Sequence, residues 1–95
     1  MKARKLFYHK ETHDDVIVEM VLWQMPEVSA ERPHRLKYRF FCGTAQTCLV
    51  RYDNETGKGD HRHYGDQEEH YRFQSIEKLV EDFRNDCVRL ADWEW

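Results

Sequence analysis

A single stretch with helical periodicity, residues 75–91, limits the folds open to this 95-residue chain. Ser75 suits the N-cap position, where its hydroxyl can accept an unpaired backbone N–H of the first turn. Apolar residues then recur at spacings of one, three and four, which predicts one buried stripe. The stripe consists of Ile76, Leu79, Val80, Phe83, Cys87, Leu90 and Ala91. Because one helix covers only one face of a sheet, the opposite face is expected to be polar.

The chain before this helix has the composition and alternation of short β-strands. We predict strands over residues 3–9, 16–25, 35–40 and 47–53, and another within 61–73, where 70–73 is the clearest stretch. Pro26 and the polar residues up to Pro33 separate the second strand from the third. These elements predict one α+β domain over residues 1–95, an antiparallel sheet of four to five strands with the C-terminal helix packed on one face.

The third predicted strand alternates basic and apolar side chains. It reads Arg35, Leu36, Lys37, Tyr38, Arg39 and Phe40. A period of two predicts that the three apolar side chains face the helix and that the three cations line the uncovered face. Such a row is either an anion-binding surface or a solvated face whose long side chains cover apolar area. The regular spacing favours anion binding.

Composition and charge narrow the class of protein. No segment approaches the ~20 apolar residues needed to span a bilayer, and the N-terminal residues lack a secretory pattern, so we expect a cytoplasmic protein without a membrane partner. Three cysteines without a CxxC pair indicate neither a disulfide framework nor a zinc site. Residues 34–63 carry six Lys/Arg against three Asp/Glu, whereas residues 64–95 carry four against nine. This segregation favours a basic working surface.

The segment 51–63 concentrates groups that carry chemistry. It places two histidines, three cations and three carboxylates around Gly57 and Gly59. Histidine is the side chain whose ordinary pKa lies nearest neutrality. Loops of this kind on a rigid scaffold often carry function, and the alternative is a solvated hairpin connection.

The same segment carries a family resemblance. The strings Arg51-Tyr52-Asp53-Asn54-Glu55 and Gly57-Lys58-Gly59-Asp60-His61-Arg62-His63, followed by Glu69, Tyr71 and Phe73, resemble the TumE-like family of toxins from toxin–antitoxin modules. The likeness extends to residues 18–23, residues 37–39 and the C-terminal helix. One departure is His70, where many relatives have proline. The resemblance implies a toxin whose partner is a helix-turn-helix antitoxin encoded by the adjacent gene. It does not imply a reaction.

From the residues we favour an endoribonuclease that needs neither a metal nor another cofactor. Such cleavage requires a base for the 2′-OH, an acid for the leaving 5′-oxygen, and cations for the transition state. We expect His61 and His63, with Lys58 and Asp60, to be the catalytic groups. Residues 61–63 in an extended conformation would project both imidazoles from one face.

Other residues would bind the RNA. Phosphate backbone contacts dominate nucleic-acid affinity, and aromatic rings stack on unpaired bases. The residues expected to bind RNA or its phosphates are Arg35, Lys37, Arg39, Arg51, Arg62 and Tyr52. Asp53 and Glu69 are expected to orient a histidine or to pair with a cation.

Two alternatives stay open. The first is a metal-dependent phosphodiesterase in which His61 and His63 bind an ion beside Asp53 and Asp60, although Lys58 and Arg62 would oppose a divalent cation. The second is a non-catalytic module that engages the antitoxin and RNA or the ribosome through its basic face.

Overall fold

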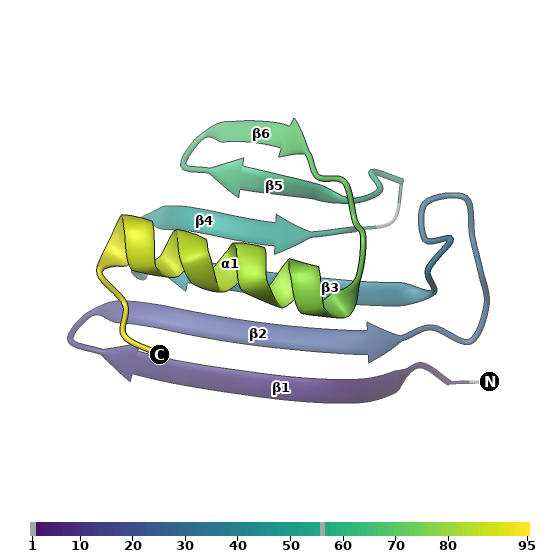
Figure 1. Ribbon diagram of the computed structural model, residues 1–95, viewed down its shortest axis with the longest axis horizontal. Helices are drawn as coiled ribbons and strands as arrows, with labels where there is room; N and C mark the ends of the chain where they lie inside the picture. Colours follow the sequence, from purple (N-terminus) through teal and green to yellow (C-terminus); the bar gives the residue numbers. More distant parts are fainter. Residues whose placement is uncertain (1, 56) are drawn as a thin grey trace.

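The computed structural model describes residues 2–55 and 57–95, so Met1 and Thr56, the latter in the predicted loop, lie outside the described residues. Its elements are β1 (Arg4–His13), β2 (Val16–Gln24), β3 (Leu36–Gly43), β4 (Cys48–Asp53), β5 (His61–Tyr64), β6 (Gln67–His70) and α1 (Ile76–Ala91). The strands form one antiparallel sheet in the order in which they follow along the chain (Figure 1). The predicted α+β class is confirmed, with six strands instead of four to five.

The additional strand arises from a tight hairpin after β5. Gly65 has a positive φ of 61°, and the pair Gly65 and Asp66 joins β5 to β6 in a two-residue turn of the kind that favours glycine. The strand predicted within residues 61–73 is confirmed by β5 and β6, but the choice of 70–73 as its clearest stretch is wrong, because residues 71–75 form the connection to α1. Tyr71 contributes to the apolar pattern of this stretch because its ring is buried in the core. Its hydroxyl donates to Asp82 of α1 at 2.7 Å.

The helix begins as predicted. The Ser75 Oγ accepts the backbone N–H of Lys78 at 3.0 Å, and α1 ends where Asp92 adopts a left-handed φ of 52°. Leu79, Phe83 and Cys87 of the apolar stripe are fully buried. Figure 1 shows α1 lying across the middle of the sheet, where it packs on β3 and β4.

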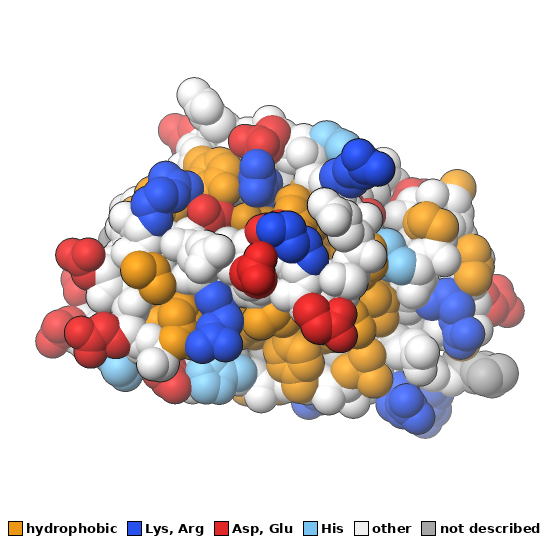
Figure 2. All heavy atoms as spheres, in the orientation of Figure 1, with side chains coloured by type: hydrophobic (Ala, Val, Ile, Leu, Met, Phe, Trp, Pro, Cys, Tyr) orange, Lys and Arg blue, Asp and Glu red, His pale blue; other side chains and the backbone are white. Residues whose placement is uncertain are grey.

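The core lies between α1 and one face of the sheet, which we call the covered face. Alternate residues of β2, β3 and β4 supply it, as period-2 strands require. They are Val18, Met20, Leu22, Leu36, Tyr38, Phe40, Cys42, Val50 and Tyr52. The prediction that the apolar residues of the third strand face the helix is therefore confirmed. Seen from the helix side, basic and acidic side chains are interspersed, with apolar side chains exposed between them (Figure 2).

The opposite side of the sheet, which we call the open face, collects the remaining alternate residues. Directly paired residues of neighbouring strands project from the same face. Arg39 pairs with Asp53, and Asp53 in turn pairs with His61. Arg51 pairs with His63, which pairs with Glu68. The register thus brings two cations, two carboxylates and two histidines onto one face.

The predicted row of three cations is shorter than expected. Lys37 and Arg39 lie on the open face, but Arg35 precedes β3 and has a positive φ of 63°. Its guanidinium donates to the carbonyls of Met25 and Pro26 at 3.2 and 3.3 Å. Arg35 therefore closes the connection between β2 and β3 and does not extend the row.

Within the described residues, no helix is long and apolar enough to cross a membrane.

Candidate functional site

Five side chains of the open face form a connected group that we call the histidine cluster. They are Arg51, Asp53, His61, His63 and Glu68. Strands β4, β5 and β6 hold them in neighbouring positions by register alone. The two imidazole rings lie 4.9 Å apart, as the predicted extended conformation of residues 61–63 requires.

His61 and Asp53 form the buried end of this cluster. The His61 Nε2 lies 2.5 Å from Asp53 Oδ1, and the side chains are 5% and 2% exposed. The other ring nitrogen, Nδ1, contacts the Gly59 carbonyl at 2.9 Å. Gly59 has a positive φ of 74°, a geometry that glycine adopts readily. Because both nitrogens of His61 already face oxygen atoms, this ring orients Asp53 and offers no free nitrogen to a substrate.

Arg51 links Asp53 to the second histidine. Its Nε lies 2.9 Å from Asp53 Oδ2, and its Nη2 lies 3.0 Å from His63 Nε2. Asp53 is close enough to Arg51 and His61 to form ion pairs with them. Among the described residues, however, no donor is aligned for a hydrogen bond to either carboxylate oxygen. A guanidinium only donates. The His63 Nε2 must therefore accept, which assigns the proton of the neutral ring to Nδ1.

His63 is held in its neutral form. Burial lowers the pKa of His63, and the positive charge of Arg51 lowers it further, against the opposing charges of Asp53 and Glu68. The Nδ1 atom lies 3.8 Å from Glu68 Oε2. An uncharged imidazole with its lone pair fixed on Nε2, beside a guanidinium, has the chemistry of a general base next to an anion-stabilising cation.

Glu68 is the member of this cluster that the sequence hypothesis did not assign to the site. Its carboxylate lies 3.8 to 4.0 Å from His63 Nδ1, His61 Nε2 and Lys58 Nζ. The signal for it was present in the sequence. A hairpin turn at Gly65 and Asp66, continued with a period of two, places Glu68 opposite His63.

The cluster contains nitrogen and oxygen donors of the kind that bind metal ions. Ligand atoms of Asp53, His61 and His63 lie within 4.8 Å of one another, and the buried Asp53 carboxylate lacks aligned donors. The guanidinium of Arg51 argues against an ion, because it contacts both Asp53 and the Nε2 of His63. An ion on Nε2 would lie against this positive charge. Coordination through Nδ1 would place the ring proton on Nε2, facing donors. The donor set therefore does not fit a metal while Arg51 holds this position.

Lys58 and Asp60, both predicted to be catalytic, differ in their relation to the cluster. Lys58 borders it through the 4.0 Å contact with Glu68. Asp60 instead accepts the Tyr38 hydroxyl at 2.6 Å and contacts His34 Nε2 at 3.1 Å. These bonds tie the loop to the end of β3. They give Asp60 a role in packing, and its predicted catalytic role has no support in its contacts.

Three predicted site residues belong to the covered side: Tyr52 and Arg62, expected to bind RNA, and Glu69, expected to orient a histidine or to pair with a cation. Tyr52 is fully buried and its hydroxyl donates to Asp86 of α1 at 2.6 Å, so its ring cannot stack on a base. The Arg62 guanidinium lies 5.3 to 5.8 Å from the ring centroids of three tyrosines and donates to Glu69 at 3.0 Å. Sequence alternation alone assigns residue 62 to the face opposite residues 61 and 63, which explains this outcome.

Comparison with known proteins identifies the family. The sequence model of the family described as Toxin TumE matches residues 2–91. The chain belongs to this toxin family. A toxin of this kind implies an antitoxin partner. Neither a search of curated proteins nor a search of solved structures found a match.

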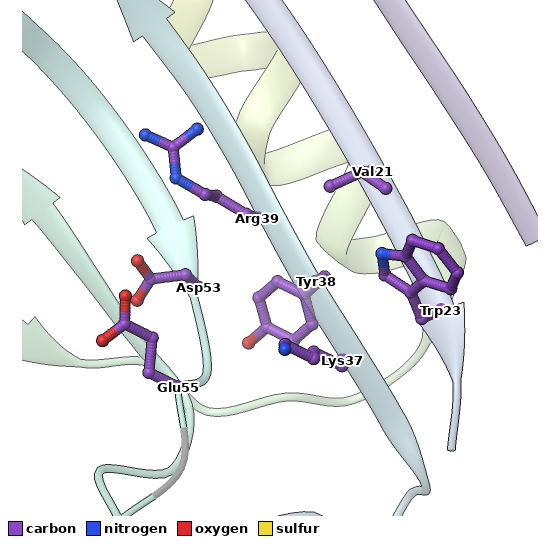
Figure 3. A pocket seen from close by; sticks show the side chains of 7 residues that line it. All are labelled: Val21, Trp23, Lys37, Tyr38, Arg39, Asp53 and Glu55. Carbon is purple, nitrogen blue, oxygen red and sulfur yellow. The ribbon is translucent and has the colours of Figure 1, made fainter. Parts of the chain in front are cut away.

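Beside the histidine cluster, this TumE-family chain has a hollow of about 500 Å³ on the open face. Figure 3 shows it between β2, β3 and the end of β4. Its lining includes Val21, Trp23, Lys37, Arg39, Asp53 and Glu55. The hollow contains both cations that remain of the predicted row, together with an apolar wall.

Proposed function

We propose that this TumE-family toxin is an endoribonuclease that cleaves RNA without a metal ion, on the open face of its sheet. The observation that carries this proposal is the contact between Arg51 Nη2 and His63 Nε2 at 3.0 Å. It places a guanidinium that can bind a phosphate beside a ring nitrogen that can accept a proton.

In the proposed reaction, His63 is the base. The Arg51 guanidinium turns from His63 to a non-bridging oxygen of the phosphate, and Nε2 takes the proton of the adjacent 2′-OH. The oxygen attacks phosphorus and the bond to the 5′-oxygen breaks. The Glu68 carboxylate, 3.8 Å from Nδ1, stabilises the imidazolium as it forms, in the way that a carboxylate supports histidine in a catalytic triad. Contacts of this length commonly shorten when substrate binds.

The remaining groups supply charge and position. Arg51 stabilises the additional negative charge of the pentacoordinate phosphorus. Lys58 is assigned to the leaving 5′-oxygen, to which its ammonium donates a proton. His61 is assigned a positioning role, because it fixes the Asp53 carboxylate that orients Arg51. Lys37 and Arg39 add positive charge beside the reacting phosphate, which strengthens the binding of RNA.

The first test incubates the purified protein with total RNA in the presence of a chelator. We expect cleavage by the native chain and a rate lower by roughly 10²- to 10⁴-fold in His63→Asn, the usual contribution of a general base. The matched control is His9→Asn, which removes a half-exposed histidine of β1 and should leave the rate unchanged. Circular dichroism and thermal unfolding confirm that each variant is folded.

Other results would replace the proposal. Cleavage that stops with chelator and returns with zinc or manganese would establish the metal-dependent phosphodiesterase. Retention of RNA without cleavage, unchanged in His63→Asn, would establish a non-catalytic binding module for RNA or the ribosome.

The proposed antitoxin is a helix-turn-helix protein from the adjacent gene. Support comes from membership of a toxin family and from the unpaired outer edge of the ten-residue β1, which can accept a partner strand. Co-expression of the two genes with a tag on the toxin should yield a complex. Recovery of the toxin alone would contradict this partner.

A further inference from the structure

We propose that the hollow beside the histidine cluster binds a guanine base of the RNA and sets the position of cleavage. This inference rests on the proposed function, since it names the part of the substrate that lies next to the reacting phosphate. The hollow has a volume of about 500 Å³, within the range of small-molecule sites.

The walls of the hollow suit a flat heterocycle. Trp23 and Val21 of β2 form its apolar side, while Lys37 of β3 stands opposite Trp23 in the register. Figure 3 shows the indole of Trp23 and the ammonium of Lys37 bordering the same opening. Bases of single-stranded RNA are commonly held by such a combination of an aromatic face and side chains that read the edge of the base.

The polar groups of the hollow match guanine better than the other bases. Lys37 makes no ion pair among the described residues, so its ammonium is available to O6 and N7, the acceptors that lysine and arginine read on guanine. Glu55 is exposed at the other side of the hollow, and a carboxylate accepts both N1–H and the N2 amino group. Adenine would instead direct the lone pair of N1 at Glu55.

Arg39 can supply a second donor to the base, because it would lose only a weak ion pair in doing so. Its Nη1 lies 3.8 Å from Glu19 Oε1, and the two side chains are 47% and 29% exposed. Exposed ion pairs of this kind contribute little to stability, so Arg39 is free to turn toward a ligand.

The hollow is within reach of the reacting groups. Arg39 lies directly beside Asp53, and Asp53 lies beside His61 on the next strand. Two strand spacings, roughly 10 Å, separate β3 from β5, and His63 lies two residues further along the sheet than Arg39, which adds about 7 Å in that direction. One to two nucleotides span such a distance, with a base in the hollow and a nearby phosphate at Arg51 and His63.

The test titrates the full chain with GMP, AMP, CMP and UMP in separate calorimetric experiments. We expect GMP to bind about 10-fold more tightly than AMP, the discrimination of one good bidentate contact. Glu55→Gln should remove this preference, whereas Glu77→Gln, on the exposed side of α1, should retain it. Equal binding of the four nucleotides, or an unchanged preference in Glu55→Gln, would overturn the guanine site.

A second measurement separates this inference from the proposed function. Sequencing of cleaved RNA ends should show guanosine at one fixed position beside the cut. Cleavage at random sequence by a folded protein would overturn the guanine site and leave the nuclease intact. Preferential GMP binding without any RNA cleavage would support the site and overturn the nuclease.

Discussion

The buried carboxylates on the two faces of the sheet differ in their hydrogen bonds. On the covered face, Asp86 of α1 accepts the hydroxyls of Tyr52 and Tyr64 at 2.6 and 2.7 Å. Burial raises the pKa of both tyrosines, and the bond to Asp86 raises it further. On the open face, Asp53 lies between Arg51 and His61 with no aligned hydrogen bond among the described residues.

This difference indicates that the two carboxylates have different roles. Asp86 accepts neutral donors from two strands, as well as the Arg89 guanidinium of its own helix at 2.9 Å, and so fastens the helix to the sheet. Asp53 lies between the Arg51 guanidinium and the His61 imidazole, and the guanidinium also contacts His63. Interacting ionisable groups with a shifted pKa, as His63 has beside Arg51, are candidates for chemistry. We therefore assign stability to the covered face and reactivity to the open face.

The largest effect is expected from Phe83→Ala on the covered face. Phe83 is fully buried and contacts the rings of Phe40 and Tyr52. Its removal should lower the free energy of unfolding by about 3–5 kcal/mol, measured by urea denaturation. Val88→Ala, at an exposed position of the same helix, should change it by less than about 0.5 kcal/mol. A small loss in Phe83→Ala would show that the core lies elsewhere.

A smaller loss is expected from Asp53→Asn on the open face. Breaking a fully buried ion pair costs about 3–5 kcal/mol. Because the Arg51 side chain is 29% exposed, we expect about 2 kcal/mol, together with loss of RNA cleavage. The control is Asp66→Asn in the exposed turn between β5 and β6, which should change neither quantity. Full activity in Asp53→Asn would remove the positioning role of the Asp53 and His61 pair.

The double variant Lys37→Ala with Arg39→Ala separates RNA binding from stability, because both side chains are exposed on the open face. Stability should change by less than about 0.5 kcal/mol. RNA affinity should fall, and the slope of its logarithm against that of salt concentration should weaken by up to about 1.4, the limit for two lost cations that neutralise a single strand. Lys2→Ala with Arg72→Ala is the charge-matched control at exposed positions. An equal change of slope in both variants would indicate non-specific charge.

The smallest effect concerns pH. The pKa of His63 is lowered by burial and by Arg51, so the unfolded chain binds a proton on this group more readily than the folded chain. The free energy of unfolding should therefore fall as the pH drops below about 6.5, the ordinary histidine value. His63→Asn should flatten this dependence between pH 5 and 8, measured by denaturation, whereas His9→Asn should not. Identical slopes in the native chain and His63→Asn would contradict the assigned environment.

Much of the fold followed from local pattern. The Ser75 cap, the stripe around Phe83 and the alternation of β3 depend on neighbours in sequence, which a single chain displays. The β5–β6 hairpin was missed because Tyr71 and Phe73 extend an apolar pattern that belongs to the core and not to a strand.

The candidate site was predicted less completely. The shared face of His61 and His63 follows from a period of two, but the partner of each ring nitrogen depends on how the Gly59 loop and β4 return to β5. Tyr52 and Arg62 were assigned to RNA by residue type, although their positions along β4 and β5 direct them toward α1. The residue types indicate which chemistry a chain can perform, and the strand register decides which side chains lie on the same face.

In the proposed reaction, His63 beside Arg51 activates an internal 2′-OH without a metal. The chemistry of the ends produced when the purified toxin cleaves RNA in the presence of chelator tests this step. We expect 2′,3′-cyclic phosphate and 5′-hydroxyl ends, which disappear in His63→Asn and persist in His9→Asn. Ends that carry a 5′-phosphate, formed only when metal is added, would contradict it.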